Sequence, residues 1–123
     1  MSGELRALRV ELADTITGIN TYTHLPGRAV LPCVWILAGS PYLQQGDTFG
    51  SQTVRHQVVI AAQTGPNDAE TDELDRLIES VLHDLAEADY LVERVDQPIS
   101  QNLNGQEILA VPITVAGTIP ALT

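Results

Sequence analysis

The sequence has no lysine and one cysteine, and each shortage excludes a class of site. A single cysteine, Cys33, cannot form an internal disulfide, and its apolar neighbours Val34 and Trp35 indicate a small buried hydrophobic side chain in preference to a reactive thiol. A P-loop phosphate site is excluded because it needs a lysine. The sequence therefore has no disulfide framework and no nucleotide-binding motif of that kind.

Long hydrophobic runs are also absent. No apolar stretch approaches the roughly 18 residues of a membrane helix. The N-terminus lacks the basic start, apolar stretch and small-residue cleavage site of a secretory signal. We therefore expect a chain that is made in the cytosol and does not enter a membrane.

Basic residues are scarce in proportion to acidic ones. Six arginines stand against 16 acids, which gives a net charge of -10. Because basic residues drive binding to phosphate backbones, we do not expect this protein to grip nucleic acid. An acidic surface would let DNA pass without sticking, but the same charge is equally well explained by solubility alone.

What the sequence does contain is the composition of one globular domain. The chain has 123 residues, of which 44% are hydrophobic and 18% charged. A chain of this size buries roughly two-thirds of the surface that it exposes when unfolded. We expect one domain over residues 1–123, with one core.

The first third of the chain predicts a helix followed by two strands. Leucines and an isoleucine recur every three or four residues over residues 4–16, and Gly18 is placed to end that helix. Residues 19–24 alternate as a short strand, and a proline-bounded loop leads to a second strand over residues 33–38. That strand is apolar at nearly every position, which is typical of burial on both faces.

The centre of the chain carries the strongest periodic signals. Alternation over residues 51–63 places Val54, His56, Val58, Ile60 and Ala62 on one face of a strand. A long amphipathic helix follows over residues 68–87, with the apolar face Leu74, Leu77, Ile78, Val81, Leu82 and Leu85. Half of the 16 acids lie on this helix, so its outer face should be strongly negative.

The last third predicts two further strands and a hairpin. Residues 90–95 alternate as a strand, and Asn104 with Gly105 is a typical two-residue hairpin turn. The final strand carries Pro112, which cannot donate a ladder hydrogen bond and therefore predicts an edge or a bulge. The fold class is therefore α+β, with a single mostly antiparallel sheet and two main helices packed on it.

Catalytic and metal-binding signals are weak. His24, His56 and His83 fall on different elements, without a second ligand at zinc spacing. Ser40 is followed by Pro41, so the G-x-S-x-G elbow of hydrolases is absent. Only a grouping of Ser40, His56 and Asp47 would provide a nucleophile and a base, and the spacing does not favour it.

The acidic stretch that opens the long helix does not form a calcium loop either. Counted from Asn67, the sixth position of such a loop would be Asp72, where glycine is needed. Helix capping and the helix dipole explain these acids without an ion. We expect no catalytic residue, no metal and no cofactor.

The polar segment of residues 39–50, which carries three breakers, is the most informative feature. At about twelve residues it is longer than a connection between adjacent strands requires, so it predicts a long functional loop between the central strands. Its large apolar side chains either pack on the protein's own core or bury against another chain, where aromatic residues are enriched. The candidate intersubunit or partner contacts are Tyr42, Leu43, Gln44, Gln45, Asp47 and Phe49.

The order of elements resembles that of the tail terminator proteins of long-tailed, siphovirus-type bacteriophages. The opening of the resemblance is LRALRVELADTITGINTYTHLPGRAVLPCVWI, a helix, a short strand and a proline-bounded loop. It continues in VRHQVVIAAQTGPNDAETDELDRLIESVLHDLAEADYLVERVDQ and closes with GQEILAVPITVAGTI. The resemblance covers nearly the whole chain and is one of pattern and element order, without a catalytic motif.

Members of that family are α+β domains that assemble as a hexameric ring on the tail tube, end its growth and form the surface that joins the head. The resemblance thus implies a structural virion protein of the tail and neck region, assembled in the host cytoplasm. Its partners would be further copies of itself, the tail tube protein and a head-completion or neck protein, with DNA passing through unbound. The segment over residues 39–50 would reach a neighbouring subunit or the tube.

Two other interpretations remain. A head-side neck or head-completion protein of the same virion would share the small size, the acidity and the lack of catalytic groups. A small α+β ligand-binding or enzymatic domain is the alternative from a different class, and it would need a pocket in which His56 approaches a carboxylate.

Overall fold

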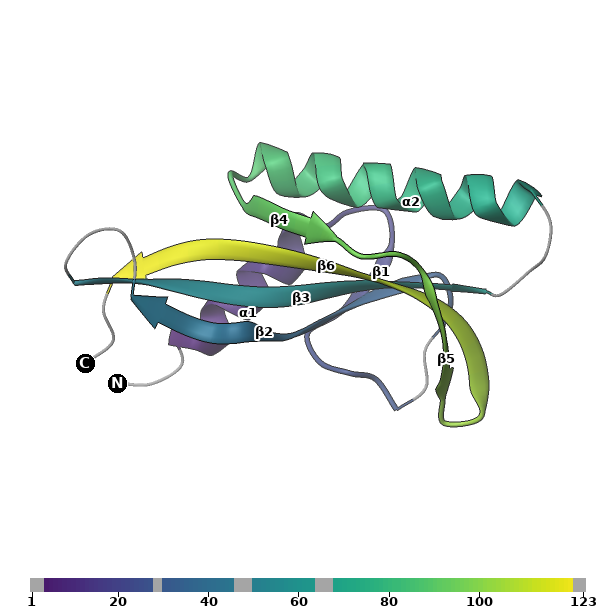
Figure 1. The fold of residues 1–123 in the computed structure, drawn as a ribbon, viewed down its shortest axis with the longest axis horizontal. Helices are drawn as coiled ribbons and strands as arrows, with labels where there is room; N and C mark the ends of the chain where they lie inside the picture. The colour runs from purple at the N-terminus through teal and green to yellow at the C-terminus, as the bar shows by residue number, and fades with distance from the viewer. Residues whose placement is uncertain (1–3, 28–29, 46–49, 64–67, 121–123) are drawn as a thin grey trace.

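The computed structural model describes residues 4–27, 30–45, 50–63 and 68–120, which form two helices and six strands (Figure 1). The elements, in chain order, are α1 Glu4–Thr15, β1 Asn20–Tyr22, β2 Cys33–Gln45, β3 Ser51–Gln63, α2 Asp68–Glu87, β4 Leu91–Val95, β5 Ile99–Leu103 and β6 Gln106–Pro120.

One open sheet contains all six strands. The strand order is β1-β2-β3-β6-β4, and β5 pairs with a different part of β6. β1 runs parallel to β2, and every other pairing is antiparallel. The predicted fold class, α+β with a mostly antiparallel sheet and two helices, is confirmed.

Both helices pack on the same face of the sheet and form the larger core. α1 contributes Leu12 and Ile16, and α2 contributes Leu74, Val81 and Leu85. These side chains meet alternate residues of the central strands, namely Val34, Ile36, Val58, Ile60, Val111, Ile113 and Val115. Each fully buried side chain of this size stabilises the fold by about 1.5–3 kcal/mol relative to exposure, so this layer holds the helices on the sheet.

The opposite face of the sheet carries a second, smaller apolar cluster, and neither of the two described helices covers it. It contains the buried residues Cys33, Trp35, Val59, Ala61, Ile108 and Ala110. Leu31 and Leu103 cover part of it from the loop before β2 and from β5. Cys33 is buried, as predicted, and burial raises the pKa of its thiol to about 11, which favours the uncharged thiol at neutral pH.

Two turns depend on left-handed backbone conformations. Asn104 and Gly105 both have positive φ, 51° and 86°, as a two-residue type I′ hairpin requires, which confirms the predicted turn. α2 ends differently from a glycine cap, because Asp89 takes the left-handed position with φ 64°. The amide of Tyr90 then donates to the carbonyl of Leu85 at 3.1 Å, which closes a Schellman motif.

The sequence predicted an edge or a bulge at Pro112, but this residue does not lie at an edge of the sheet. It belongs to β6, which pairs with β3 along one side and with β4 and β5 along the other. Its carbonyl accepts a hydrogen bond of 2.9 Å from the amide of Asp96, in the connection between β4 and β5. Pro112 therefore faces the connection between the β4 and β5 ladders. Its lack of an N–H costs no ladder hydrogen bond there, so an interior strand tolerates the proline.

The prediction of a loop over residues 39–50 is largely wrong. β2 continues to Gln45, so the connection to β3 begins only after that residue. The register shifts between Ala38 and Leu43, so that residues 39–42 face Arg55 alone on β3. A bulge of this kind accommodates Pro41 and returns the strand to its partner, whereas the breaker residues alone had indicated a loop.

Gly39 allows that bulge to form. A Cβ at this position would lie 2.7 Å from Cβ of Arg55 and 2.9 Å from its carbonyl carbon. We expect Gly39→Ala to lower the free energy of unfolding by about 1–3 kcal/mol, because backbone must move to relieve the overlap. Gly27→Ala is the matched control, since a Cβ there meets nothing within 4 Å. Chemical denaturation of both variants measures the difference, and equal stabilities would contradict the account of the bulge.

Candidate interaction surface

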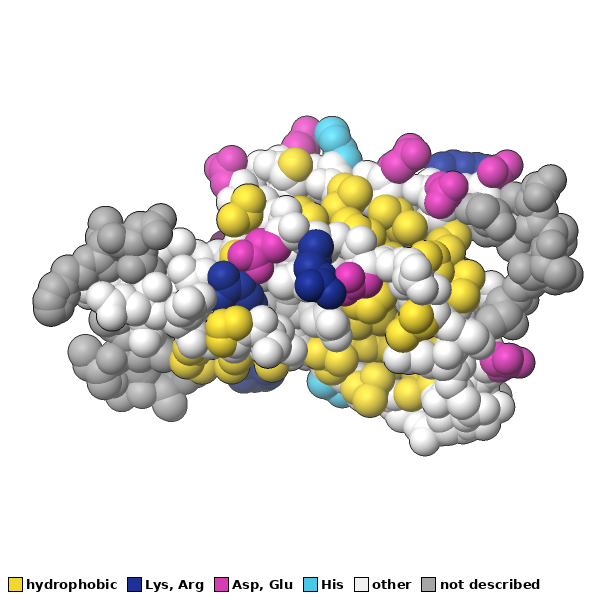
Figure 2. Space-filling view, viewed as in Figure 1, with side chains coloured by type: hydrophobic (Ala, Val, Ile, Leu, Met, Phe, Trp, Pro, Cys, Tyr) yellow, Lys and Arg dark blue, Asp and Glu magenta, His cyan; other side chains and the backbone are white. Residues whose placement is uncertain are grey.

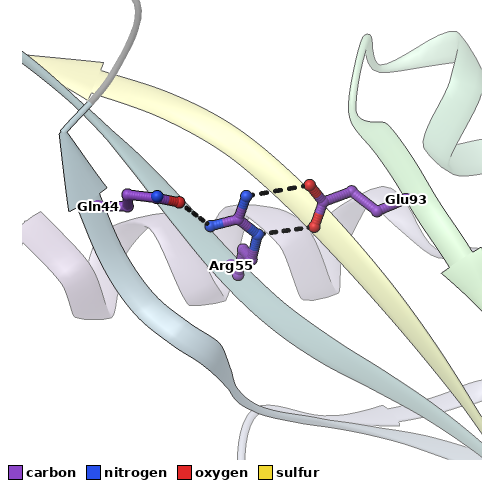
Figure 3. A network of polar contacts seen from close by, with 3 residues as sticks. All are labelled: Gln44, Arg55 and Glu93. Carbon is purple, nitrogen blue, oxygen red and sulfur yellow. Dashed lines mark hydrogen bonds and ion pairs between the residues drawn. The ribbon is translucent and has the colours of Figure 1, made fainter.

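Arg55 joins three strands on the helix-free face of the sheet (Figure 3). Its Nε and Nη2 atoms donate to the two carboxylate oxygens of Glu93 on β4, at 2.7 and 3.1 Å. Its Nη1 atom donates to the side-chain oxygen of Gln44 on β2 at 2.7 Å. The guanidinium therefore lies across β6 and ties both flanks of the sheet to β3.

The electrostatics of this group follow from its partners. The hydrogen bond to Glu93 raises the pKa of Arg55 most, burial opposes that rise, and Coulomb attraction to Glu93 adds to it. The pair is bidentate and mostly shielded from water, because the side chains of Arg55 and Glu93 are only 18% and 28% exposed. We call the set Gln44, Arg55 and Glu93 the arginine clamp.

Beside the arginine clamp, the same face is hollowed. A depression of about 410 Å³ opens between the central strands, β5 and the loop before β2. Apolar residues that line it include Leu25, Trp35, Leu37, Val59, Leu103 and Pro112. The remaining polar lining consists of the amides Gln57, Gln101 and Asn102, so no ionisable side chain among the described residues lines the hollow. We call it the neutral depression.

Hydrophobic side chains gather on this face between α2 and the β5–β6 hairpin (Figure 2). Leu25, on the wall of the neutral depression, is 50% exposed. Ile99 on β5, which pairs with Ala110 of the smaller cluster, is 41% exposed. Apolar surface concentrated in this way marks contact sites more often than scattered single residues do.

The outer face of α2 is strongly acidic, as predicted. Asp72, Glu73, Asp75, Glu79 and Glu87 are exposed along it, and acidic side chains mark this helix in Figure 2. Its arginine, Arg76, lies 3.5 Å from Glu73 in a solvent-exposed ion pair that contributes little stability. This side of the molecule therefore differs in charge from the neutral depression.

The six residues expected to make partner contacts are placed unevenly. Tyr42 is half-buried, and its ring meets that of His56 edge-on at 5.7 Å. Leu43 is 36% exposed, Gln45 is exposed, and Gln44 belongs to the arginine clamp. Asp47 and Phe49 lie outside the described residues. A contact role for all six stays a prediction.

Sequence reasoning missed both the arginine clamp and the neutral depression. An arginine in the middle of an alternating apolar strand was the available signal for Arg55, since such a charge needs a partner. Its partner Glu93 lies 38 residues away and across an intervening strand, so no local pattern joins them. The depression combines residues from five separate segments and has no sequence signature.

His56 is the buried titratable group on the helix-covered side of the sheet. It is 3% exposed, and its Nε2 atom has no hydrogen-bond partner in the described part of the chain. Burial lowers the pKa of His56 most, and the nearby charge of Arg9 on α1 lowers it further. Ser40 is exposed on β2 and Asp47 lies outside the described residues, so the structure gives no contact among the three members of that grouping.

Neither a metal site nor a membrane helix emerges from the residues that the structure describes. Within them, no group of three or more histidine, cysteine, aspartate and glutamate side chains is arranged to hold a metal ion. No helix among them combines the length and the apolar composition needed to cross a bilayer. No protein-family model matches the chain, and no curated protein matches it.

The buried His56 predicts a dependence of stability on pH. Because the folded protein lowers the pKa of His56 below 6.5, the unfolded chain takes up the proton first as pH falls. The stability associated with neutral His56 is therefore complete above about pH 6.5 and is lost as pH falls through the folded pKa. We expect His56→Gln to show a shallower loss of unfolding free energy than wild type between about pH 7.5 and 5.5.

Denaturant titrations over that pH range measure the slopes. His83→Gln is the control, because it removes a histidine that is exposed on α2. Identical slopes for wild type and His56→Gln would contradict the assignment of a depressed pKa to His56.

The arginine clamp predicts energetic coupling between β3 and β4. We expect Arg55→Met and Glu93→Gln each to destabilise the protein, and the double variant to lose less than the sum of the two. The exposed pair Arg94 and Asp96, whose side chains are 69% and 36% exposed, is the control and should show little coupling. Double-mutant cycles by chemical denaturation test this, and additive effects for Arg55 and Glu93 would refute it.

Proposed function

We propose that this chain is a structural virion protein of the tail terminator type, which caps the phage tail tube as a ring. In this role it ends polymerisation of the tube and forms the surface to which the filled head joins. The observation that carries the proposal is the one-sided architecture. Both helices cover one face of the sheet, and the other face, with its exposed apolar residues, is left available for contacts.

The α+β fold agrees with what the resemblance implies. A ring subunit needs two different contact surfaces, because head-to-tail contacts close a ring only when the two sides of the subunit differ. An open sheet with helices on one face and none of the described helices on the other provides surfaces that differ in this way (Figure 1). The ring is proposed as a hexamer, in contact with the tail tube protein below and a neck protein above.

The charge distribution supports passage of DNA in preference to its binding. Three of the six arginines, Arg55, Arg76 and Arg94, are each paired with an acid of the same chain. The acidic face of α2 repels a phosphate backbone, and repulsion favours sliding over arrest. A subunit with this surface would therefore line or border a channel without gripping what passes through it.

The test is to add the purified protein to growing tail tubes of the matching phage and to examine them by electron microscopy. We expect ring-shaped density on one end of each tube and tubes stopped at a uniform length. Tubes that grow unchanged with bare ends would refute the terminator role. Filled heads incubated in parallel are the control, and binding to heads alone would assign the protein to the head-side neck.

A further inference from the structure

β5 is an edge strand whose outer side has no partner strand in the part of the chain that the structure describes. It pairs with β6 alone, and the β5–β6 hairpin bends away from the other strands at the end of the molecule opposite the chain termini (Figure 1). Each residue of β5 is at least partly exposed. An edge of this kind presents backbone N–H and C=O groups with which a strand of another chain can pair.

The register of the hairpin identifies the backbone groups on the outer side. Leu103 and Gln106 flank the two-residue turn and form the hydrogen-bonded pair that closes it. Bonded and non-bonded pairs alternate along an antiparallel ladder, so Gln101 bonds to β6 whereas the N–H and C=O groups of Ser100 and Asn102 point outward. Among the described residues, no backbone–backbone hydrogen bond outside the helices and ladders reaches either of these two.

The other described edges of the sheet carry features that oppose pairing with another chain. Beyond the three residues that β1 covers, the outer side of β2 is interrupted by the bulge that contains Pro41. β4 has a register shift at Glu93 and carries Arg94 beside it. Bulges, prolines and charges are common means by which edge strands avoid unwanted pairing. β5 has none of them, because its register with β6 is unbroken and its sequence ISQNL has no charge and no proline.

The sequence of β5 is complementary to itself in antiparallel register. When two copies pair about a two-fold axis at Gln101, Ile99 lies opposite the partner's Leu103, and Ser100 lies opposite the partner's Asn102. An apolar side chain then meets an apolar one, and a hydroxyl meets an amide. The outward N–H and C=O groups of Ser100 and Asn102 are also brought opposite each other, as a hydrogen-bonded pair requires.

Shifted registers use the strand less well. An axis at Ser100 would bring Pro98, which has no N–H to donate, into the pairing. An axis at Asn102 would bring the turn at Asn104 and Gly105 into it. The axis at Gln101 pairs all five residues and stops short of both interruptions.

Charge does not oppose this contact, although each copy carries a net charge of -10. The acid within the β5–β6 ladder is Glu107, which lies opposite Asn102 on β6. In the paired arrangement three strand spacings, about 14 Å in all, would separate the β6 strands of the two copies. That separation exceeds the Debye length of about 8 Å at physiological ionic strength, so repulsion between the two copies of Glu107 is largely screened.

We propose that β5 pairs with β5 of a second copy of this chain, antiparallel about a two-fold axis at Gln101, and joins the two sheets into one. The contact is isologous, because both copies contribute the same surface. It is separate from the head-to-tail contacts of a ring, so the inference goes beyond the proposed function and does not rest on it. Five residues from each copy make a small contact, which is typical of weak and transient association.

Charge substitution at the axis tests the contact. We expect wild type to show a reversible monomer–dimer equilibrium by analytical ultracentrifugation between about 10 µM and 1 mM. Gln101→Lys and Gln101→Glu should each weaken the dimer roughly tenfold or more, because the axis places two like charges directly opposite each other. An equimolar mixture of the two variants should restore a dimer at least as strong as that of wild type, because opposite charges then face each other.

The matched controls are Gln45→Lys and Gln45→Glu, since Gln45 is exposed on β2 as Gln101 is on β5. Alone or mixed, they should associate as wild type does. Amide hydrogen exchange gives a second measurement: Ser100 and Asn102 should exchange more slowly at about 1 mM than at about 10 µM, whereas Gln101, already bonded to β6, should change less.

Three results would overturn the proposal. One is a wild-type protein that stays monomeric up to about 1 mM. Another is a dimer that withstands both substitutions at Gln101, and the third is a mixture of the two variants that associates no better than either alone. The amide spectrum of each variant verifies that it is folded. No tail tube is present, so these outcomes are independent of the capping assay.

Discussion

The pairing of β3 with β6 is the constraint on which the rest of the structure depends. All 13 residues of β3 pair with β6 in one unbroken register, from Ser51 with Pro120 to Gln63 with Ile108. Because side chains alternate along paired strands, this register assigns every central residue to one of two faces. A slip of one residue would turn Val58 and Ile60 away from the helices, so helix packing and the helix-free surface are determined together.

Periodic signals predicted those parts of the fold in which the local pattern and the tertiary packing agree. Each of these parts follows one simple local rule. β3 alternates with a period of two, α2 has one apolar face, and Asn104–Gly105 fits one turn type. The second half of β2 was predicted as a loop because Gly39 and Pro41 usually interrupt a strand. Its pairing with β3, which keeps it extended, is a tertiary contact that the local sequence does not show. Gly39 and Pro41 fit a strand only because the bulge places them opposite Arg55.

The contact surface was less predictable than the fold, for a related reason. Leu43 and Gln44 were identified as candidates from their place in a polar segment, but the structure gives them different roles. Gln44 is held by Arg55, whereas Leu43 stays partly exposed. The neutral depression needs β5 to turn over the helix-free face, and nothing in the sequence of β5 says where that strand lies.

The two faces of the sheet contribute differently to stability. Most of the apolar burial lies between the helices and the sheet, so stability is concentrated on the helix-covered face. Exposed residues of the other face, such as Leu25, change with little effect on that core. The arginine clamp belongs to neither the helix-side core nor the freely exposed residues, because it lies on the helix-free face yet joins strands β2, β3 and β4. It therefore fixes the shape of the helix-free face, which we propose as the contact surface, while the exposed residues around it are not held by the same network.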